Sequence, residues 1–526
     1  MVDAIIIGAG HNGLVTATYL AKAGLKPLIV EASEQIGGCA VTQEFAPGFK
    51  TSSVAHLLHA LHPRVVKDLG LENHGLLQLC RPVATSVRAA DGARIDISSD
   101  AAATVNSIAR FSAADAAAYP VVMARLGKLA TALGGFMMRT PPRPSIKEND
   151  FQAKLALGMF ALQLRMLGKK DMLELSRILT MNVADLANDH FESDLIKGLI
   201  SFEATLGVYL GPRSPNTVFN LLYRLASFGK HGMGALYQPA GGMGAVAETL
   251  AKAARAAGVL IRNRAAVDHI LVEQEQAVGV VLQSGEEIRA PIVASSADPQ
   301  RTLLRLLQPG QLDTEFQQRI RHLRMNGCVA KVHLALDALP QGVAASDGRL
   351  VIAPSINHVE RAFDCAKYGR VADRPALEVV FPSLADPSLA PSGKHVASIL
   401  YQYAPYRLRD TPVATAREQV LARCLATLDD VFPGFSNQVR ASEVLVPQDL
   451  ETRFGLSGGQ WHQGEVTLDQ MFFLRPVAQF QQYRMPVPGL WLCGAGAHPG
   501  GNVSGAAGAN AAREIIKAQK GGRAAQ

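Results

Sequence analysis

The chain has 526 residues, of which 48% are apolar and 18% charged. A folded protein of this size buries a large core and is expected to divide into two lobes. The formal net charge is +7, but no dense run of Lys and Arg alternates with aromatic residues, so nucleic acid is not expected as a partner.

The cysteines and the apolar runs limit the class of protein further. No two cysteines form a C-x-x-C pair or cluster with histidines at metal-ligand spacing, which predicts free thiols, no metal site and no dithiol-disulfide reductase. No run reaches the roughly 18–20 apolar residues of a membrane span, and no presequence is visible. We therefore expect a cytoplasmic protein, and the mild positive charge leaves peripheral contact with a membrane open.

The first thirty residues predict a strand–turn–helix–strand unit. An apolar run at 2–7 precedes the turn Gly8-Ala9-Gly10-His11-Asn12-Gly13, and residues 14–23 have helical spacing before a second strand at 28–30. The turn matches G-x-G-x-x-G: Gly8 permits a tight turn, Gly10 lets a pyrophosphate approach the helix, and Gly13 allows close packing. Glu31, eighteen residues after Gly13, is placed to accept hydrogen bonds from a ribose. This context predicts a dinucleotide site.

The composition and the predicted secondary structure change twice in the middle of the chain. Residues 71–230 are rich in Ala, Leu and Met at helical spacing and predict a mostly helical insertion, interrupted at Thr140–Pro144. Short strands are expected at 259–261, 267–272, 278–282 and 292–295, and residues 300–482 mix strand and helix signals. A buried strand at 490–493, a glycine-rich turn and a helix at 505–517 close the chain.

Two glycine-rich segments carry a family resemblance. Residues 32–38, which end in Gly37-Gly38, and residues 494–505 resemble the FAD proteins of the amine oxidase and phytoene desaturase superfamily, in which a C-terminal segment covers the flavin. Shorter matches resemble the phytoene desaturase-related branch of FAD-dependent oxidoreductases; they lie at 191–193, 239–244, 297–299, 469–470 and 475–476.

The resemblance covers nearly the whole chain and implies both fold and cofactor. The expected fold class is α/β, with a Rossmann-like FAD-binding domain of the amine oxidase/phytoene desaturase type and an inserted α+β substrate domain. The FAD-binding domain is expected at 1–70, 236–300 and 485–526, and the substrate or lid domain at 71–235 and 301–484. The expected cofactor is FAD, held without a covalent bond.

The resemblance also implies which residues contact FAD. The ADP half is expected on the turn and on the end of the second strand, the adenine on the backbone of Val267, and the flavin end on the C-terminal turn. The expected cofactor-binding residues are Gly8, Gly10, Gly13, Glu31, Gly37, Gly38, Val267, Gly494, Gly496 and Val503.

Few side chains stand out as catalytic. His498 lies in the flavin-covering turn and is the candidate for the reaction chamber. His56 and His59 are spaced to share a helical face, although a structural segment near the flavin edge is the simpler interpretation because a metal site would need further ligands. Three interpretations are open for a further polar group: its side chains line a substrate pocket, lie in an exposed loop, or form a structural ion pair. The group consists of Trp461, His462, Asp469 and Arg475.

The leading functional hypothesis is a desaturase or isomerase of an apolar, isoprenoid-like substrate. The substrate tunnel of such an enzyme is expected to end at the flavin near His498, under a helical region at 151–167. The apolar stripe of this region suits either a core helix or an interfacial helix. A flavin amine oxidase and a non-catalytic flavoprotein that acts as an interaction partner are the alternatives. The sequence leaves the substrate's identity, the electron acceptor and the oligomeric state open.

Overall fold

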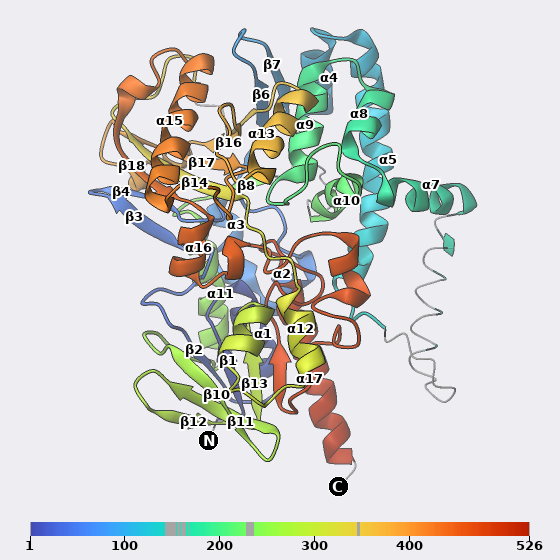
Figure 1. Cartoon of the computed structure of the whole chain (residues 1–526), viewed down its shortest axis with the longest axis vertical. Coiled ribbons are helices and arrows are strands. Elements are labelled where there is room, and N and C mark those ends of the chain that lie inside the picture. The colour runs from blue at the N-terminus through green and yellow to red at the C-terminus, as the bar shows by residue number, and fades with distance from the viewer. Residues whose placement is uncertain are drawn as a thin grey trace.

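The computed structural model describes residues 2–142, 168–227, 236–343 and 348–524, together with Lys154, Gly158, Leu162, Arg165 and Met166. Two sheets dominate this part of the chain, one in the lower half of Figure 1 and one in the upper half. Both termini lie at the lower end. Among the described residues, no helix is long and apolar enough to cross a membrane.

The lower sheet has five parallel strands in the order β19-β13-β1-β2-β9. Their short, apolar sequences are typical of strands that are covered on both faces. The strands come from distant parts of the chain: β1 (Ala4–Ile7), β2 (Pro27–Val30), β9 (Leu260–Arg262), β13 (Ile292–Ser295) and β19 (Leu490–Leu492).

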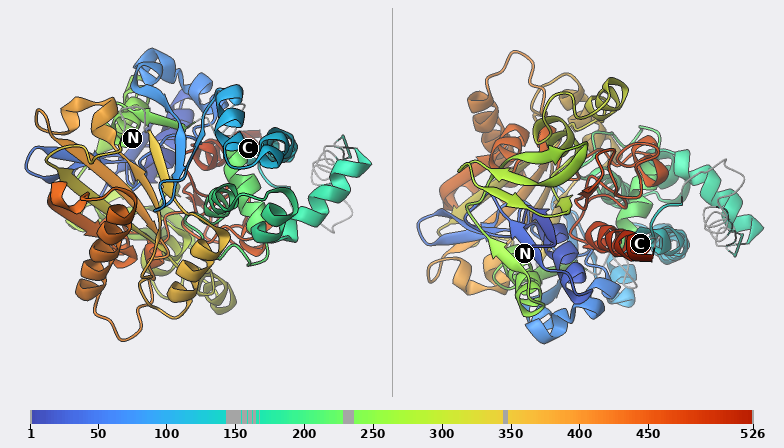
Figure 2. Two further views of the ribbon diagram at one scale, coloured as in Figure 1. Left: turned by 90° about the horizontal axis from the view of Figure 1, so that it is seen from above. Right: turned by 90° about the horizontal axis from the view of Figure 1, so that it is seen from below.

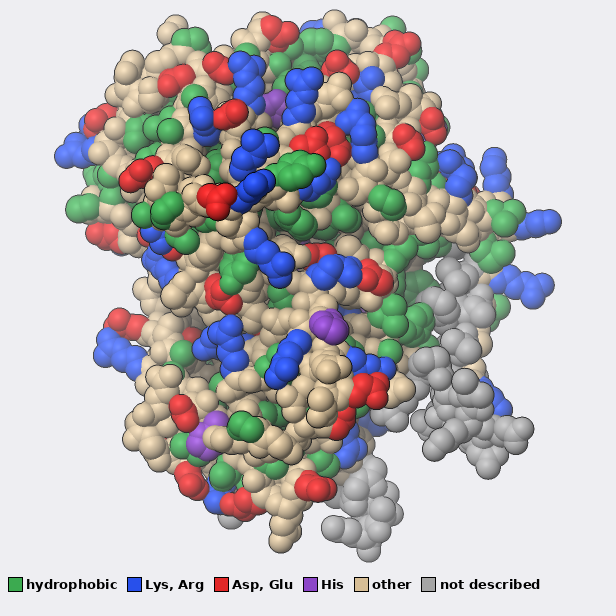
Figure 3. Space-filling view, viewed as in Figure 1, with side chains coloured by type: hydrophobic (Ala, Val, Ile, Leu, Met, Phe, Trp, Pro, Cys, Tyr) green, Lys and Arg blue, Asp and Glu red, His purple; other side chains and the backbone are tan. Residues whose placement is uncertain are grey.

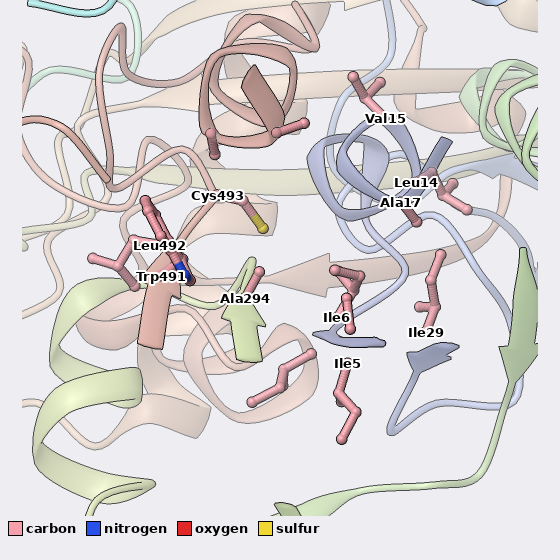
Figure 4. Close-up of a cluster of buried hydrophobic side chains, with 14 of the residues drawn as sticks. Ile5, Ile6, Leu14, Val15, Ala17, Ile29, Ala294, Trp491, Leu492 and Cys493 are labelled. Atoms are coloured by element: carbon pink, nitrogen blue, oxygen red, sulfur yellow. The ribbon is translucent and has the colours of Figure 1, made fainter. Parts of the chain in front are cut away.

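Helices cover one face of this sheet and a small antiparallel sheet covers the other. Helix α1 (His11–Lys22) packs between α11 (Met243–Ala256) and α17 (Ala506–Ala524). Figure 4 shows Leu14 and Ala17 of α1 over Ile6 and Ile29 of the sheet, and all four side chains are fully buried. The covering sheet consists of β10 (Val267–Glu273), β11 (Gln276–Leu282) and β12 (Glu287–Arg289).

The upper sheet has seven strands in the order β18-β14-β17-β16-β15-β6-β7. All of β14 is buried although it contains Lys331 and His333, so these polar groups need partners in the interior. The strands are β6 (Thr85–Arg88), β7 (Arg94–Ile97), β14 (Val329–Leu336), β15 (Arg349–Ile352), β16 (Ala376–Val380), β17 (His395–Gln402) and β18 (Val439–Leu445).

Helices flank the upper sheet, and four further strands form two two-stranded sheets. Figure 2 shows that α7 (Lys169–Thr180) stands away from the body in both views. The paired strands are β3 (Thr42–Ala46) with β4 (Phe49–Ser52) and β5 (Cys80–Val83) with β8 (Leu236–Pro239). The remaining helices are α2 (Pro63–Leu69), α3 (Leu76–Leu79), α4 (Ala101–Ala109), α5 (Ala113–Met137), α8 (Val183–His190), α9 (Asp194–Thr205), α10 (Thr217–Ser227), α12 (Thr314–Arg321), α13 (Ile356–Lys367), α14 (Pro382–Ala385), α15 (Val413–Val431) and α16 (Pro447–Phe454).

The expected α/β fold class is confirmed, and the helical interpretation of 71–230 needs one correction. This stretch begins with the three short strands β5, β6 and β7, of which β6 and β7 extend the upper sheet through β15. The expected helix at 151–167 lies mostly outside the described residues, and only Lys154, Gly158, Leu162, Arg165 and Met166 belong to the described part.

Candidate functional site

The turn between β1 and α1 leaves the N-terminus of a helix open to a cavity. Gly8 has a φ of +94°, and a Cβ at Gly13 would lie 2.1 Å from the carbonyl oxygen of Gly8. Glycine at these positions therefore brings the helix against the turn. A Cβ at Gly10 would have no heavy atom within 4 Å, so glycine there leaves open space beside the helix terminus, where an anion binds favourably.

Glu31 is fixed at the end of β2 by three hydrogen bonds. Its Oε2 accepts from the backbone N–H of Ala9 at 2.6 Å, and its Oε1 accepts from the N–H and Oγ of Ser33 at 2.9 and 2.8 Å. A carboxylate held at this place can accept a ribose hydroxyl and disfavours a 2′-phosphate.

These groups border a cavity of about 530 Å³, which we call the nucleotide cavity. It extends from the ends of β1 and β2 to Ala495 at the start of the C-terminal turn. Six of the residues expected to bind the cofactor line it: Gly8, Gly10, Glu31, Gly37, Gly38 and Val267. Their individual roles in binding stay predictions.

The other expected cofactor residues do not line this cavity; they are Gly13, Gly494, Gly496 and Val503. A Cβ at Gly494 would be 2.3 Å from the carbonyl oxygen of Ser296, and one at Gly496 would be 2.3 Å from Cδ of Pro299. Both glycines therefore let the C-terminal turn pack against the segment that follows β13. Val503 lines a second cavity, described below.

The residues around the nucleotide cavity fit FAD. One long cavity joins the carboxylate of Glu31 to the C-terminal turn, as an extended dinucleotide requires. At the open helix terminus, Nε2 of His11 is buried without a hydrogen-bond partner among the described residues. Such an orphaned polar atom is costly unless a ligand contacts it.

Arg475 holds the C-terminal turn in place. Its buried guanidinium donates to the carbonyl oxygens of Ala495 at 2.8 Å and of Glu465 and Gln470 at 3.2 Å each. Burial lowers the pKa of Arg475 to about 10, so the group remains a cation at neutral pH. Of the alternatives for this segment, Arg475 is a buried structural group that binds backbone carbonyls, whereas Asp469 forms an ion pair with Arg324 at 2.8 Å.

His498 is buried in the same turn, but it lines neither cavity. Its Nε2 lies 3.0 Å from the carbonyl oxygen of Phe136, and burial lowers the pKa of the ring to about 4. A catalytic role for His498 stays a prediction, as does a tunnel that ends beside it.

A second cavity of about 120 Å³ adjoins the first, and we call it the chamber. His11, Cys39, Trp461 and Ala495 line both cavities, so the chamber adjoins the nucleotide cavity at these residues. One part of its wall is apolar and comprises Val54, Leu57, Leu206, Leu236, Leu400 and Val503. The polar part comprises His56, His59, Arg224, Glu378 and His462.

The polar wall corrects the helical interpretation of the histidine segment. Residues 53–62 are not helical in the structure. Nε2 of His56 instead lies 2.6 Å from Oε1 of Glu378, on β16 of the upper sheet. The histidine-bearing segment is thus a structural part of the chamber wall. In the part of the chain that the structure describes, no cluster of three or more His, Cys, Asp and Glu side chains could hold a metal ion.

Of the polar wall, the sequence interpretation named His56, His59 and His462 but missed Arg224 and Glu378. Glu378 interrupts the otherwise apolar strand Ala376–Val380, and Lys331 and His333 interrupt the strand Val329–Leu336. A charged residue inside a fully buried strand is itself a signal, because it must have a partner or a functional role. Arg224 on α10 carries no comparable signal in the sequence.

The comparisons with known proteins identify the family. The family described as "Flavin containing amine oxidoreductase" matches residues 13–516. The chain belongs to this family and is an FAD-dependent oxidoreductase.

Individual relatives indicate the branch of the family to which the chain is similar. The chain is 36% identical to "Pyridine nucleotide-disulfide oxidoreductase domain-containing protein 2" of Rattus norvegicus, over 98% of this chain and 93% of the relative. It is 28% identical to a component of the limonene dehydrogenase of Castellaniella defragrans (98% and 94% covered). It is 25% identical to "Phytoene desaturase (neurosporene-forming)" of Cereibacter sphaeroides (96% and 92% covered). The expected phytoene desaturase-related branch is confirmed.

Solved structures share the fold. An oxidoreductase from Methanosarcina mazei superposes with a TM-score of 0.59 at 19% identity, and covers 98% of this chain and 100% of its own. Cyclohexylamine oxidase from Brevibacterium oxydans superposes with a TM-score of 0.56 at 16% identity, and 99% of each chain is covered.

Proposed function

We propose that this enzyme oxidises or isomerises an apolar, isoprenoid-like substrate in the chamber. The observation that carries the proposal is the apolar wall of the chamber beside the nucleotide cavity, which includes Leu57, Leu206, Leu236 and Leu400. Such a wall favours hydrocarbon over charged groups, because an unpaired charge would lose its hydration there. Two relatives in the same branch are named for limonene and phytoene.

The charges around the chamber favour this proposal over an amine oxidase. The cations Arg224 and Arg349 are matched by the carboxylates Glu203 and Glu378, which they contact directly. A protonated amine would therefore meet no net negative charge. Among the described residues that line the chamber, Trp461 is the sole Phe, Tyr or Trp side chain, so these residues form no aromatic cage.

The protein and the cofactor have different roles in the proposed reaction. FAD, when bound, supplies the two-electron acceptor for a hydride. The protein positions the hydrocarbon against the leucine wall and excludes water from it. The buried imidazoles lining the chamber are uncharged at neutral pH, because burial lowers the pKa of His56 to about 4 and that of His59 and His462 to about 3.

Anaerobic mixing of the FAD-loaded enzyme with limonene, cyclohexylamine or putrescine tests the proposal. We expect loss of flavin absorbance with the hydrocarbon, and a product analysed by mass spectrometry that has lost two hydrogens. An isomerised product without net flavin reduction would indicate the isomerase form. Rapid bleaching by either amine, with none by limonene, would overturn the proposal in favour of an amine oxidase.

We further propose that α7, together with Leu162 and Met166, touches an anionic membrane surface, from which an apolar substrate would be drawn. Leu162, Met166 and Leu173 are 57%, 78% and 58% exposed, and Lys169 and Lys170 lie among them. Figure 3 shows Lys, Arg and hydrophobic side chains side by side on the projecting edge that α7 forms in Figure 1. This combination suits an interfacial element.

Co-sedimentation with vesicles tests this contact. We expect binding to phosphatidylglycerol vesicles, weak binding to phosphatidylcholine, and loss of binding in Leu173→Glu. The matched control is Leu260→Glu, since Leu260 is 63% exposed on β9. Equal binding by both variants would contradict the assignment of this surface.

A further inference from the structure

The ring of His462 is buried in the polar wall of the chamber, and one of its nitrogens lacks a hydrogen-bond partner. The residue is 7% exposed, and its Nδ1 has no partner among the described residues. A Cβ at Gly501 would lie 2.1 Å from this nitrogen, so the ring packs against the backbone of the C-terminal turn. A buried imidazole of this kind is costly unless the cavity that it lines holds a ligand.

The backbone of His462, in contrast, is bonded on both sides. Its N–H donates to Oε1 of Gln460 at 3.2 Å, and its carbonyl oxygen accepts from the guanidinium of Arg475. The ring itself lies edge-on to Trp461, with 5.9 Å between the ring centroids. These contacts fix the place of the residue and leave its ring as the part that can bind a ligand.

Other members of the polar wall already bind one another or their neighbours. Nζ of Lys331 lies 2.7 Å from Nδ1 of His56, and Nε2 of the same ring lies 2.6 Å from Oε1 of Glu378. Nε of Arg349 donates to Oε2 of Glu378 at 2.6 Å, and Arg224 lies 3.9 Å from the same oxygen. Much of the polar wall is therefore engaged before any ligand binds.

The ring of His462 offers the chamber a neutral donor. Burial, together with the nearby cations Arg475 and Arg224, lowers its pKa to about 3, and even an unperturbed histidine is mostly uncharged above pH 7. A neutral imidazole has one N–H and one acceptor nitrogen. Buried N–H groups without an acceptor are rarer in proteins than unpaired acceptors, so we place the ring proton on Nε2, at the tip of the ring.

The surroundings favour a neutral partner for this donor. The two arginines and two glutamates beside the chamber pair with one another, so neither a carboxylate nor an ammonium group would meet a net opposite charge. An ionised group would lose its hydration there without compensation. The rest of the chamber wall is apolar. A molecule that matches both parts of the wall has a hydrocarbon body and one neutral oxygen.

We propose that the substrate carries one neutral oxygen, as a hydroxyl or carbonyl group, and that Nε2 of His462 donates to this oxygen. The inference rests on the proposed function, because it takes the chamber as the substrate site, and it narrows the isoprenoid-like substrate to an oxygenated one. The contact orients the substrate, with its oxygen at the polar wall and its hydrocarbon body against the leucines. A ligand without the oxygen leaves the buried donor unpaired, so His462 determines specificity.

Calorimetric titration of the reduced enzyme tests this contact. The FAD-loaded enzyme is reduced with dithionite without oxygen, so that the flavin accepts no further hydride and binding is measured without turnover. The probes share one carbon skeleton: limonene, perillyl alcohol, perillate and perillylamine. Perillyl alcohol should bind to the wild-type enzyme about two- to twelve-fold more tightly than limonene, which is the net effect of one neutral hydrogen bond. The two charged probes should bind more weakly than limonene.

Variants separate the hydrogen bond of the ring from its bulk. In His462→Phe the hydroxyl of perillyl alcohol is buried without a partner, so this probe should bind about five- to 150-fold more weakly than limonene. His462→Gln keeps an N–H donor and should keep the wild-type order. The matched control is His333→Phe, which replaces a buried histidine that lines neither cavity and should also keep that order. FAD content and Tm are measured for each variant.

The order of the probes decides the inference. Equal binding of limonene and perillyl alcohol by the wild-type enzyme would overturn it, and so would tight binding of perillylamine. A preference for the alcohol that survives in His462→Phe, with a shifted flavin spectrum in the ligand-free variant, would show that the ring donates to the flavin instead. Failure of both limonene and perillyl alcohol to reduce the oxidised enzyme would overturn the proposed function, while the binding order still stands.

Discussion

Replacing Gly10 or Gly13 of the same turn by alanine should affect stability and FAD binding differently. At Gly13 the added Cβ would lie 2.1 Å from the carbonyl oxygen of Gly8, well inside contact distance, so α1 must move away from the turn. Overpacking of this kind costs about 1–3 kcal/mol. At Gly10 the added Cβ meets nothing within 4 Å, and the φ of −66° suits alanine.

The protein without FAD should therefore tolerate Gly10→Ala. Alanine is a poorer N-cap than glycine, but it lowers the entropy of the unfolded chain, and the two effects nearly cancel to within about 0.5 kcal/mol. In the loaded protein, the methyl group occupies space that the pyrophosphate needs. An overlap of about 1–3 kcal/mol weakens FAD binding roughly five- to 150-fold.

The assay combines the Tm of the apoprotein with FAD titration by fluorescence. Gly13→Ala should lower both the Tm and the affinity for FAD, whereas Gly10→Ala should lower the affinity alone. If Gly10→Ala binds FAD as tightly as the wild type, the pyrophosphate does not lie at this turn. If it lowers the Tm of the apoprotein as much as Gly13→Ala does, the steric argument fails.

Other predictions concern the covering turn, the buried charges and the cofactor. Arg475→Met should cost at least about 3 kcal/mol, because each buried carbonyl left without a donor costs about 1–3 kcal/mol; an unchanged Tm would contradict this. Arg349→Met removes one of the two arginines that pair with Glu203 and Glu378, and should cost about 3–5 kcal/mol at pH 7. Since Arg349 keeps the pKa of Glu378 low, that pKa rises in the variant, and the deficit measured by Tm should shrink as the pH falls toward 4.5. Denaturation should release intact FAD, and flavin retained by the unfolded chain would refute non-covalent binding. NADH and NADPH should reduce the flavin slowly in stopped-flow experiments, because FAD occupies the one complete fingerprint in the sequence; rapid bleaching would reveal a second nucleotide site.

The nucleotide cavity could be predicted because its signals are local. Gly8, Gly10 and Gly13 lie within six residues, and Glu31 follows at the end of the next strand, so a single β-α-β unit specifies their arrangement. Strand β7 (Arg94–Ile97) was not predicted, although charged and apolar residues alternate in its sequence. A period-two pattern over four residues in a helix-rich stretch is easy to overlook.

The chamber could not be predicted in the same way. His56 and Glu378 are separated by 322 residues, and neither flanking sequence shows that they will meet. The spacing of His56 and His59 suggested a helix because three residues nearly complete a helical turn. In the structure, the contacts of His56 with β14 and β16 decide its position instead.

The energetics of the buried charges bear on why they lie beside the chamber. Removing Arg349, Glu203 and Glu378 from water costs several kcal/mol per ion, and their mutual attraction often does no more than repay that cost. Apolar side chains of similar volume would stabilise this interior at least as well. Stability alone is therefore a weak reason for an ion network here. An electrically neutral wall is a stronger reason, because it admits a hydrocarbon and offers no net attraction to a cation.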